Sequence, residues 1–143
     1  MGEPRLFGKT YRVTASDPEA ETILICLGDV ATKIDVPVMD RWILSWFEAY
    51  HWGEDFPGSE YQEDSMKEGG RYLSADEFDA IKASEAQVID GIFDGYKDNQ
   101  WYIRMHCLDS SWWDITCNDP AVLEKLAEWD DAEEVDQKDV DLD

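Results

Sequence analysis

The sequence predicts a single α+β domain, built on an antiparallel sheet of about six strands with helices mainly on one face. Three observations lead to this prediction. The 143-residue chain is long enough to bury one core, and 43% of its residues are hydrophobic. Apolar residues alternate with period two through much of the second half. Residues that favour helix starts precede runs with helical apolar spacing. We assign residues 1–129 to the domain and residues 130–143 to a disordered acidic tail.

In the first half, we expect three strands and then a helix. Residues 22–27 form a short, continuously apolar run, which is typical of a strand covered on both faces. Pro37 suits the first turn of a helix. The strands cover residues 5–14, with Phe7, Tyr11 and Val13 on one side, then 22–27 and 30–36; the helix covers 37–52, with a stripe of Val38, Trp42, Trp46 and Ala49.

A long acidic loop is predicted as an insertion over residues 53–70, because this stretch combines six acids with four glycines. Its acids include Glu54, Asp55, Glu60, Glu63 and Asp64. Ser74 and Glu77 then form a capping box, which opens a short helix that ends near Ala83.

The second half predicts a three-strand meander over residues 87–96, 101–108 and 112–117. A helix follows, in which Asp119 is the cap and Pro120 takes the first position. Its apolar stripe is Val122, Leu123, Leu126 and Trp129.

The two halves echo each other. A Cys-Leu pair ends the second strand of each, and a tryptophan follows the helix-starting proline nine residues later in both. This pattern suggests a βββα duplication, although the matches are few enough for chance to be the alternative.

Alternation determines the register of the meander, because a slip by one residue exchanges the two faces of a strand. A three-residue loop at 109–111 gives a wholly apolar core face, whereas a two-residue loop would bury Asp114. The core face then holds Trp101, Ile103, Met105, Cys107, Trp113, Ile115 and Cys117, with Ile89, Gly91, Phe93 and Gly95 from the preceding strand.

The opposite face mixes aromatic rings with carboxylates. It carries Val88, Asp90, Ile92, Asp94, Tyr96, Tyr102, Arg104, His106, Leu108, Trp112, Asp114 and Thr116. In this register His106 lies between Asp90 and Asp114. If no helix covers this face, Trp112 is an exposed ring in an acidic field.

Charge is the strongest compositional signal. The chain carries 34 acids against 12 bases, for a net charge of −22, and the tail accounts for only −7 of it. The acidity therefore belongs mostly to the folded body. It disfavours direct binding to nucleic acid and to anionic membranes, both of which need lysine and arginine.

Three cysteines, Cys26, Cys107 and Cys117, form no CxxC pair, so we expect reduced, buried thiols. The N-terminal residues contain no apolar leader, and no apolar run approaches the ~20 residues of a membrane helix. A cytoplasmic location is the expectation.

No catalytic residue, metal site or cofactor is assigned. Asp90, His106 and Asp114 could form a general base held by carboxylates, but a surface histidine with a cross-strand salt bridge is the simpler interpretation. His51, near Glu54 and Asp55, could bind a metal with other ligands, but its favourable place at a helix C-terminus is the simpler interpretation. The acidic stretch lacks the spacing of a calcium loop.

These observations favour a small non-enzymatic binding protein that neutralises a basic partner by occlusion. A nuclease toxin or a DNA- or RNA-binding defence effector fits as the partner, so the chain would act as an immunity protein or as a nucleic-acid mimic. The expected partner-binding residues are Asp90, Asp94, Tyr96, Tyr102, His106, Trp112 and Asp114 on the sheet, with Glu54, Asp55, Glu60, Glu63 and Asp64 in the loop. The alternatives are a small hydrolase that uses Asp90, His106 and Asp114, and an acidic regulatory module of a larger complex.

Overall fold

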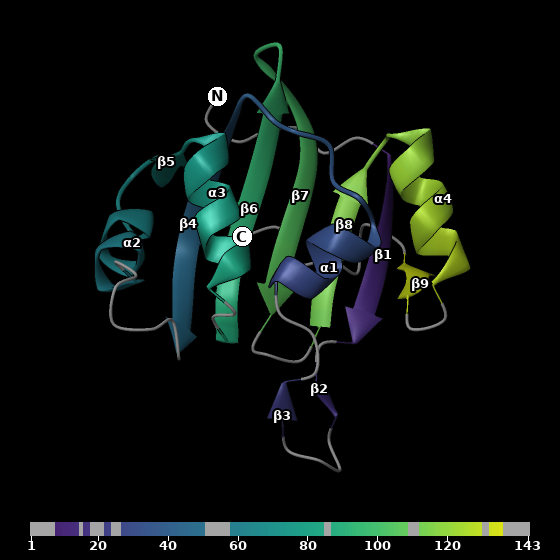
Figure 1. Ribbon diagram of the computed structural model, residues 1–143, viewed down its shortest axis with the longest axis horizontal. Coiled ribbons are helices and arrows are strands. Elements are labelled where there is room, and N and C mark those ends of the chain that lie inside the picture. The colour runs from purple at the N-terminus through teal and green to yellow at the C-terminus, as the bar shows by residue number, and fades with distance from the viewer. Residues whose placement is uncertain are drawn as a thin grey trace.

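The computed structural model describes residues 8–14, 16–17, 22–23, 27–50, 58–84, 87–108, 112–129 and 132–135. Within these residues the chain forms one seven-stranded antiparallel sheet with four helices, and β2 and β3 pair separately (Figure 1). The sheet order is β5-β4-β6-β7-β8-β1-β9. The elements are β1 (Lys9–Thr14), β2 (Ser16–Asp17), β3 (Thr22–Ile23), α1 (Leu27–Lys33), β4 (Arg41–Tyr50), α2 (Gly58–Ser65), β5 (Arg71–Leu73), α3 (Ala75–Ala83), β6 (Gln87–Lys97), β7 (Gln100–Leu108), β8 (Trp112–Cys117), α4 (Pro120–Glu128) and β9 (Ala132–Val135).

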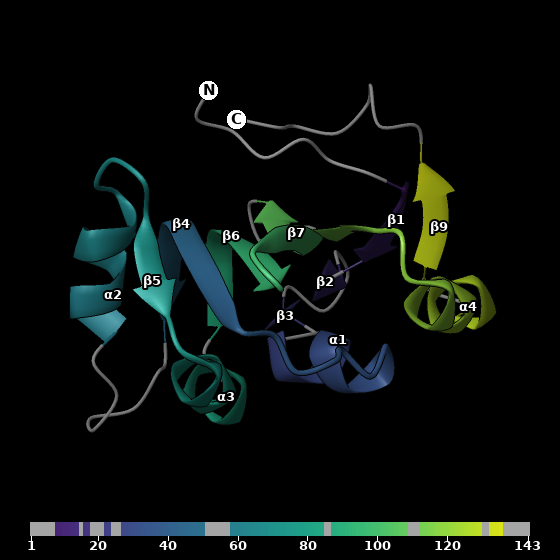
Figure 2. The same ribbon diagram turned by 90° about the horizontal axis from the view of Figure 1, so that it is seen from above.

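The α+β class and the single antiparallel sheet of the domain are confirmed. Seen from above, α1, α3 and α4 lie on the same side of the sheet, whereas α2 lies beside the edge formed by β4 and β5 (Figure 2). The sheet has seven strands instead of six. Three of them, β4, β5 and β9, were not predicted as strands, whereas β3 pairs outside the sheet and the strand predicted over residues 30–36 is absent from it.

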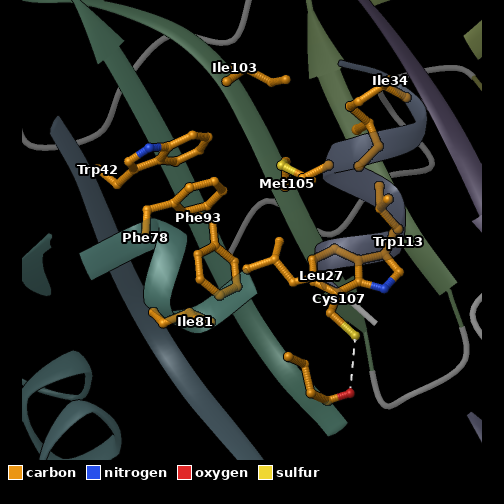
Figure 3. Packing of buried hydrophobic residues seen from close by; sticks show 14 of the residues in the cluster. Leu27, Ile34, Trp42, Phe78, Ile81, Phe93, Ile103, Met105, Cys107 and Trp113 are labelled. Carbon is orange, nitrogen blue, oxygen red and sulfur yellow. Dashed lines mark hydrogen bonds between the residues drawn. The ribbon is translucent and has the colours of Figure 1, made fainter. Parts of the chain in front are cut away.

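An aromatic cluster fills the space between the sheet and its helices (Figure 3). Trp42 of β4 stacks on Phe78 of α3, with ring centroids 3.9 Å apart and an interplanar angle of 6°. Phe93 of β6 lies edge-on to Phe78 at 6.0 Å and packs beside Trp113 of β8 at 6.2 Å. The cluster therefore joins one helix and three strands of the sheet.

The meander is confirmed, and so is the predicted register between β7 and β8. Leu108 of β7 pairs with Trp112 of β8, which leaves the three-residue connection that alternation predicts. The pairs Ile103↔Cys117, Met105↔Ile115 and Cys107↔Trp113 all lie in the core. Cys107 and Cys117 are buried, as expected, and Cys26 lies outside the described residues.

Two face assignments at the ends of the meander are wrong, because strand irregularities exchange neighbouring residues. The register of β6 and β7 shifts between Gly95 and Tyr96, so Trp101 bonds Asp94 on the polar face and Tyr102 packs against the core. A second irregularity, between β4 and β6, places Val88 in the core instead of Ile89. A bulge adds one residue to one strand, which period-two counting does not anticipate.

The first half differs most from the prediction. Residues 30–36 were expected as a strand, but the chain is helical from Leu27 to Lys33. The buried residues are Leu27, Val30, Ala31 and Ile34, which have the i, i+3, i+4, i+7 spacing of a helix face. Of the strand predicted over residues 22–27, Thr22 and Ile23 are in β3, Leu27 begins α1, and residues 24–26 lie outside the described residues. In the strand predicted over 5–14, Tyr11 and Val13 are core residues of β1, and Phe7 lies outside the described residues.

The helix predicted over residues 37–52 is instead the long strand β4. Trp42 and Leu44 are fully buried at period two, and Phe47 and Ala49 continue the pattern after a one-residue slip. Trp46, assigned to the helical stripe, is 55% exposed. Aromatic and β-branched residues suit a pleated surface, and pairing with both β5 and β6 overrides the helical spacing.

This exchange also removes the proposed βββα duplication. The segments that begin at Pro37 and Pro120 were expected to match, yet one leads into a strand and the other is α4. Within the acidic insertion, residues 58–65 are α2 and not a loop. Within the acidic tail, residues 132–135 are β9, which pairs with β1. The rest of the tail and residues 53–57 lie outside the described residues.

Both predicted helix caps are confirmed. Ser74 and Glu77 form the reciprocal capping box of α3, which ends at Ala83. Asp119 caps α4 by accepting from the Ala121 amide at 2.8 Å, and Pro120 takes the first turn. Val122 and Leu126 form the buried stripe of α4, and Leu123 and Trp129 are partly buried against the core.

Gly95 allows β6 to pass close to the aromatic cluster. A Cβ atom there would lie 2.8 Å from Met39 Cγ and 3.0 Å from Trp42 Cζ3, whereas at Gly91 the closest atom would be Phe47 Cδ1 at 3.4 Å. We expect Gly95→Ala to destabilise the fold by about 1–3 kcal/mol in urea unfolding, because extra volume strains a packed core. Gly91→Ala is the matched control and should cost clearly less; equal costs would contradict this packing.

Candidate partner-binding surfaces

The sheet face opposite α1, α3 and α4 carries a buried polar layer, not an exposed acidic field. Two rows of paired residues cross the strands in register. The first row is Arg12↔Asp114↔His106↔Ile92 and the second is Thr10↔Thr116↔Arg104↔Asp94. Every member of both rows except Arg12 is buried.

Asp114 is neutralised by Arg12. The Arg12 Nε and Nη2 atoms donate to the two carboxylate oxygens of Asp114 at 2.9 and 3.0 Å, and Asp114 is 1% exposed. The same guanidinium lies 4.4 Å from the centre of the Trp112 ring. Trp112 is therefore a half-buried ring beneath a cation, which corrects the expectation of an exposed ring among carboxylates.

Asp94 is neutralised in the same way by Arg104. The Arg104 Nε and Nη2 atoms donate to its two oxygens at 2.8 and 3.0 Å, and Trp101 Nε1 adds a third hydrogen bond at 3.0 Å. Both charged groups are buried. This three-part contact is a structural pair within the sheet, and it does not present a carboxylate to a partner.

The predicted grouping of His106 with two carboxylates is half right. His106 pairs with Asp114, as expected, but its neighbour on β6 is Ile92, and Asp90 pairs with Glu48 of β4. The β6–β7 register lies two residues away from the expected one: the turn at Asp98 and Asn99, both with positive φ, accounts for one residue, and the irregularity between Gly95 and Tyr96 adds the other. Asp90 is therefore not next to His106, as the hydrolase alternative requires.

Tyr102 and Tyr96 also have structural contacts. The Tyr102 hydroxyl donates to the Asp119 carboxylate, which ties β7 to the cap of α4. Burial, and then this bond, raises the pKa of Tyr102 to about 12, and the same bond lowers the pKa of Asp119. Tyr96 is half-buried, and the Arg41 guanidinium lies 4.7 Å from its ring centre.

The predicted loop acids are split between contacts and solvent. Arg71 of β5 bonds Glu60, Asp64 and Glu77, and stacks over the Tyr61 ring at 4.4 Å, so it joins α2, β5 and α3. The backbone bond from Ser74, and then Arg71, lowers the pKa of Glu77. Glu63 and Glu60 are exposed on α2, and Glu54 and Asp55 lie outside the described residues.

The described members of the predicted set do not form one patch. The acids of α2 lie beside β4 and β5 at one end of the sheet, and Trp112 and Asp114 belong to β8 near the other end (Figure 1). The sequence did not reveal the structural contacts of the arginines, in which Arg12, Arg71 and Arg104 bond carboxylates and Arg41 bonds Asn99. It also did not reveal that Trp46 and Tyr72 are exposed. The one pattern that could have indicated the exposure of Trp46 is the slip in the apolar alternation between Leu44 and Phe47.

Comparisons with protein-family models, with curated proteins and with solved structures found no match to this chain. Among the described residues, no three His, Cys, Asp or Glu side chains are grouped closely enough to hold a metal ion. None of the helices described is long and apolar enough to cross a membrane.

The Asp94–Arg104 pair provides a test of the buried layer. We expect Arg104→Met to destabilise the fold by about 3–5 kcal/mol, because it leaves a buried carboxylate without its cation. The double variant Arg104→Met/Asp94→Leu should recover most of this loss. Denaturant unfolding of the two single variants and the double variant measures the coupling. A double variant no more stable than Arg104→Met would show that the unpaired Asp94 carboxylate is not the cause of the destabilisation.

The lowered pKa of Glu77 predicts a loss of stability in acid. Its contribution is present above the unfolded pKa of about 4.3 and disappears as the pH falls through the lower folded value. Glu77→Gln keeps the capping box but removes the charge. We expect it to cost up to about 1 kcal/mol at pH 7 and progressively less as the pH falls below about 4.3, as measured by urea unfolding. A cost that stays constant with pH would exclude this cause.

Proposed function

We propose that this chain is a small acidic binding protein that neutralises a basic, nucleic-acid-handling protein by occlusion. The observation that supports this proposal best is the placement of the arginines. Arg12, Arg71 and Arg104 bond carboxylates of the same chain, and Arg41 bonds Asn99 and lies over Tyr96. The guanidinium groups that the structure describes are thus used within the fold.

What remains on the outside is predominantly acidic. The net charge is −22, and exposed carboxylates occur on all three of the longer helices and on β9. They include Glu60, Glu63, Asp76, Asp79, Glu124, Glu128, Glu133 and Glu134. An ordered surface of this kind attracts a positively charged cleft and speeds its association.

The residues proposed to meet the partner change accordingly. Asp94, Asp114 and His106 are buried, so in the proposed mechanism they support the sheet and do not touch the partner. The exposed acids of the helices take their place and compete with the phosphates of nucleic acid for lysine and arginine.

Isolation of the partner tests the proposal. The tagged full-length chain is bound to proteins of its native host at about 0.1 M salt, and the retained proteins are identified by mass spectrometry. We expect a basic protein that binds or cleaves nucleic acid, from which the chain displaces a labelled oligonucleotide. Recovery of a metabolic complex instead would favour the regulatory-module alternative and contradict the proposal.

Salt dependence provides the second measurement. We expect the association rate with that partner to fall by about tenfold or more between 0.05 and 0.5 M salt, because ions screen steering between exposed charges. Stopped-flow mixing at several salt concentrations measures it. A rate independent of salt would exclude electrostatic capture.

A further inference from the structure

Trp46 has a backbone conformation that is rare for a bulky residue. Its φ angle is +54°, and its side chain is 55% exposed in the middle of a strand. Such a conformation costs on the order of 1–3 kcal/mol unless the surrounding structure imposes it, and such residues concentrate at functional sites. Neither burial of the ring nor a tight turn explains its position here.

Helix α2 holds the strand in this shape. β5 pairs with β4 only from Trp42 to Leu44. Beyond that point Ser65 Oγ accepts from the Phe47 amide at 2.9 Å, and Gln62 Oε1 accepts from the Ala49 amide at 3.0 Å. Two side chains of α2 thus take the place of a neighbouring strand along the edge of β4. The two amides that they bond, of Phe47 and Ala49, lie on either side of a register shift between β4 and β6. The arrangement fixes the backbone on both sides of Trp46.

Other exposed apolar residues lie along the same edge. Met66, which is 47% exposed, directly follows Ser65, and Tyr72 of β5 is 63% exposed and pairs with Ile43 of β4. With Trp46, they are three of the four large hydrophobic residues found exposed in the described part of the chain. The views in Figures 1 and 2 agree that β4, β5 and α2 lie side by side.

The charges around this edge point to a cationic partner. Glu63 and Glu68, on and just after α2, are exposed, and Glu48 of β4 is half-buried two residues after Trp46. Lys67, the exposed lysine between them, is paired with Asp64 at 2.8 Å. An exposed indole on an edge that also carries exposed carboxylates is suited to a lysine or arginine, which gains from both the ring face and the negative charge. Tryptophan is also the residue most enriched at binding hot spots.

We infer that the edge of β4 beside α2 is the surface that binds the partner, with Trp46 as its anchor against a lysine- or arginine-rich segment of that protein. This inference rests on the proposed function for the class of partner, but the surface itself is located by the geometry of β4 and α2.

A photo-crosslinker identifies what meets this edge. The full chain carries p-benzoylphenylalanine in place of Trp46, or in place of Val38 as the control, since Val38 is 82% exposed but lies ahead of β4. After irradiation in the native host, we expect position 46 to crosslink to a basic nucleic-acid-handling protein and position 38 not to do so.

Affinity for that protein provides the second readout. Trp46→Gly removes the ring but accepts a positive φ, so the fold should be retained. We expect it to weaken binding by about 30-fold, while Val38→Ala changes binding less than twofold. Glu63→Gln/Glu68→Gln should slow association more than Glu124→Gln/Glu128→Gln on α4, although both remove two charges.

The outcomes separate the two proposals. No crosslink from position 46, or unchanged affinity of Trp46→Gly for the partner isolated with the tagged chain, overturns the surface and leaves the proposed function standing. A crosslink from position 46 to a protein that is neither basic nor concerned with nucleic acid overturns the proposed function and the cationic partner inferred here.

Discussion

The antiparallel register of β6, β7 and β8 is the constraint on which the rest of this structure depends. Pairing Phe93 with Met105, and Met105 with Ile115, directs large apolar groups toward α1 and α3. The same register places Asp94 beside Arg104 on the opposite face. Because successive side chains of a strand alternate, a slip by one residue would bury the charges under the helices and expose the aromatic core. The two faces are therefore consequences of one pairing, and they support each other.

The chemistry of arginine explains how so acidic a chain folds. Its planar fork bonds both oxygens of a carboxylate at once, which suits buried pairs such as Arg12 with Asp114. A carboxylate held in this way contributes to the fold without repelling its neighbours. Most of the described acids that no arginine holds are exposed on helices or loops, where water solvates them. The result is a neutralised interior polar layer beneath an exterior of one predominant sign, which is the physical basis for expecting a basic partner.

The edge of β4 links the fold to the inferred surface. An edge strand exposes unpaired amides that invite uncontrolled pairing with other chains, and proteins usually cover such edges. Here the cover is helix α2, through the side chains of Ser65 and Gln62. Because side chains, unlike a neighbouring strand, need not follow the pleat, they tolerate the slip at Trp46. The packing of α2 on β4 therefore both covers the edge and leaves the Trp46 ring exposed. Arg71 of β5 holds α2 in place through Tyr61 and also bonds Glu77 of α3.

The sequence by itself determined those features that depend on near neighbours in the chain. The caps at Ser74 and Asp119, the meander over 87–117 and the pairing of Cys107 with Trp113 follow from spacing and alternation, and all were predicted. Only the tertiary structure decided whether residues 41–50 would be helix or strand, since their apolar spacing fits both and pairing with β5 and β6 selects one. It also decided which carboxylates are buried: Arg12, which neutralises Asp114, is separated from it by 102 positions in the sequence, and no local pattern reveals such a partner. For the same reason the exposure of Trp46 is a property of the packed edge and not of the residues around it in sequence.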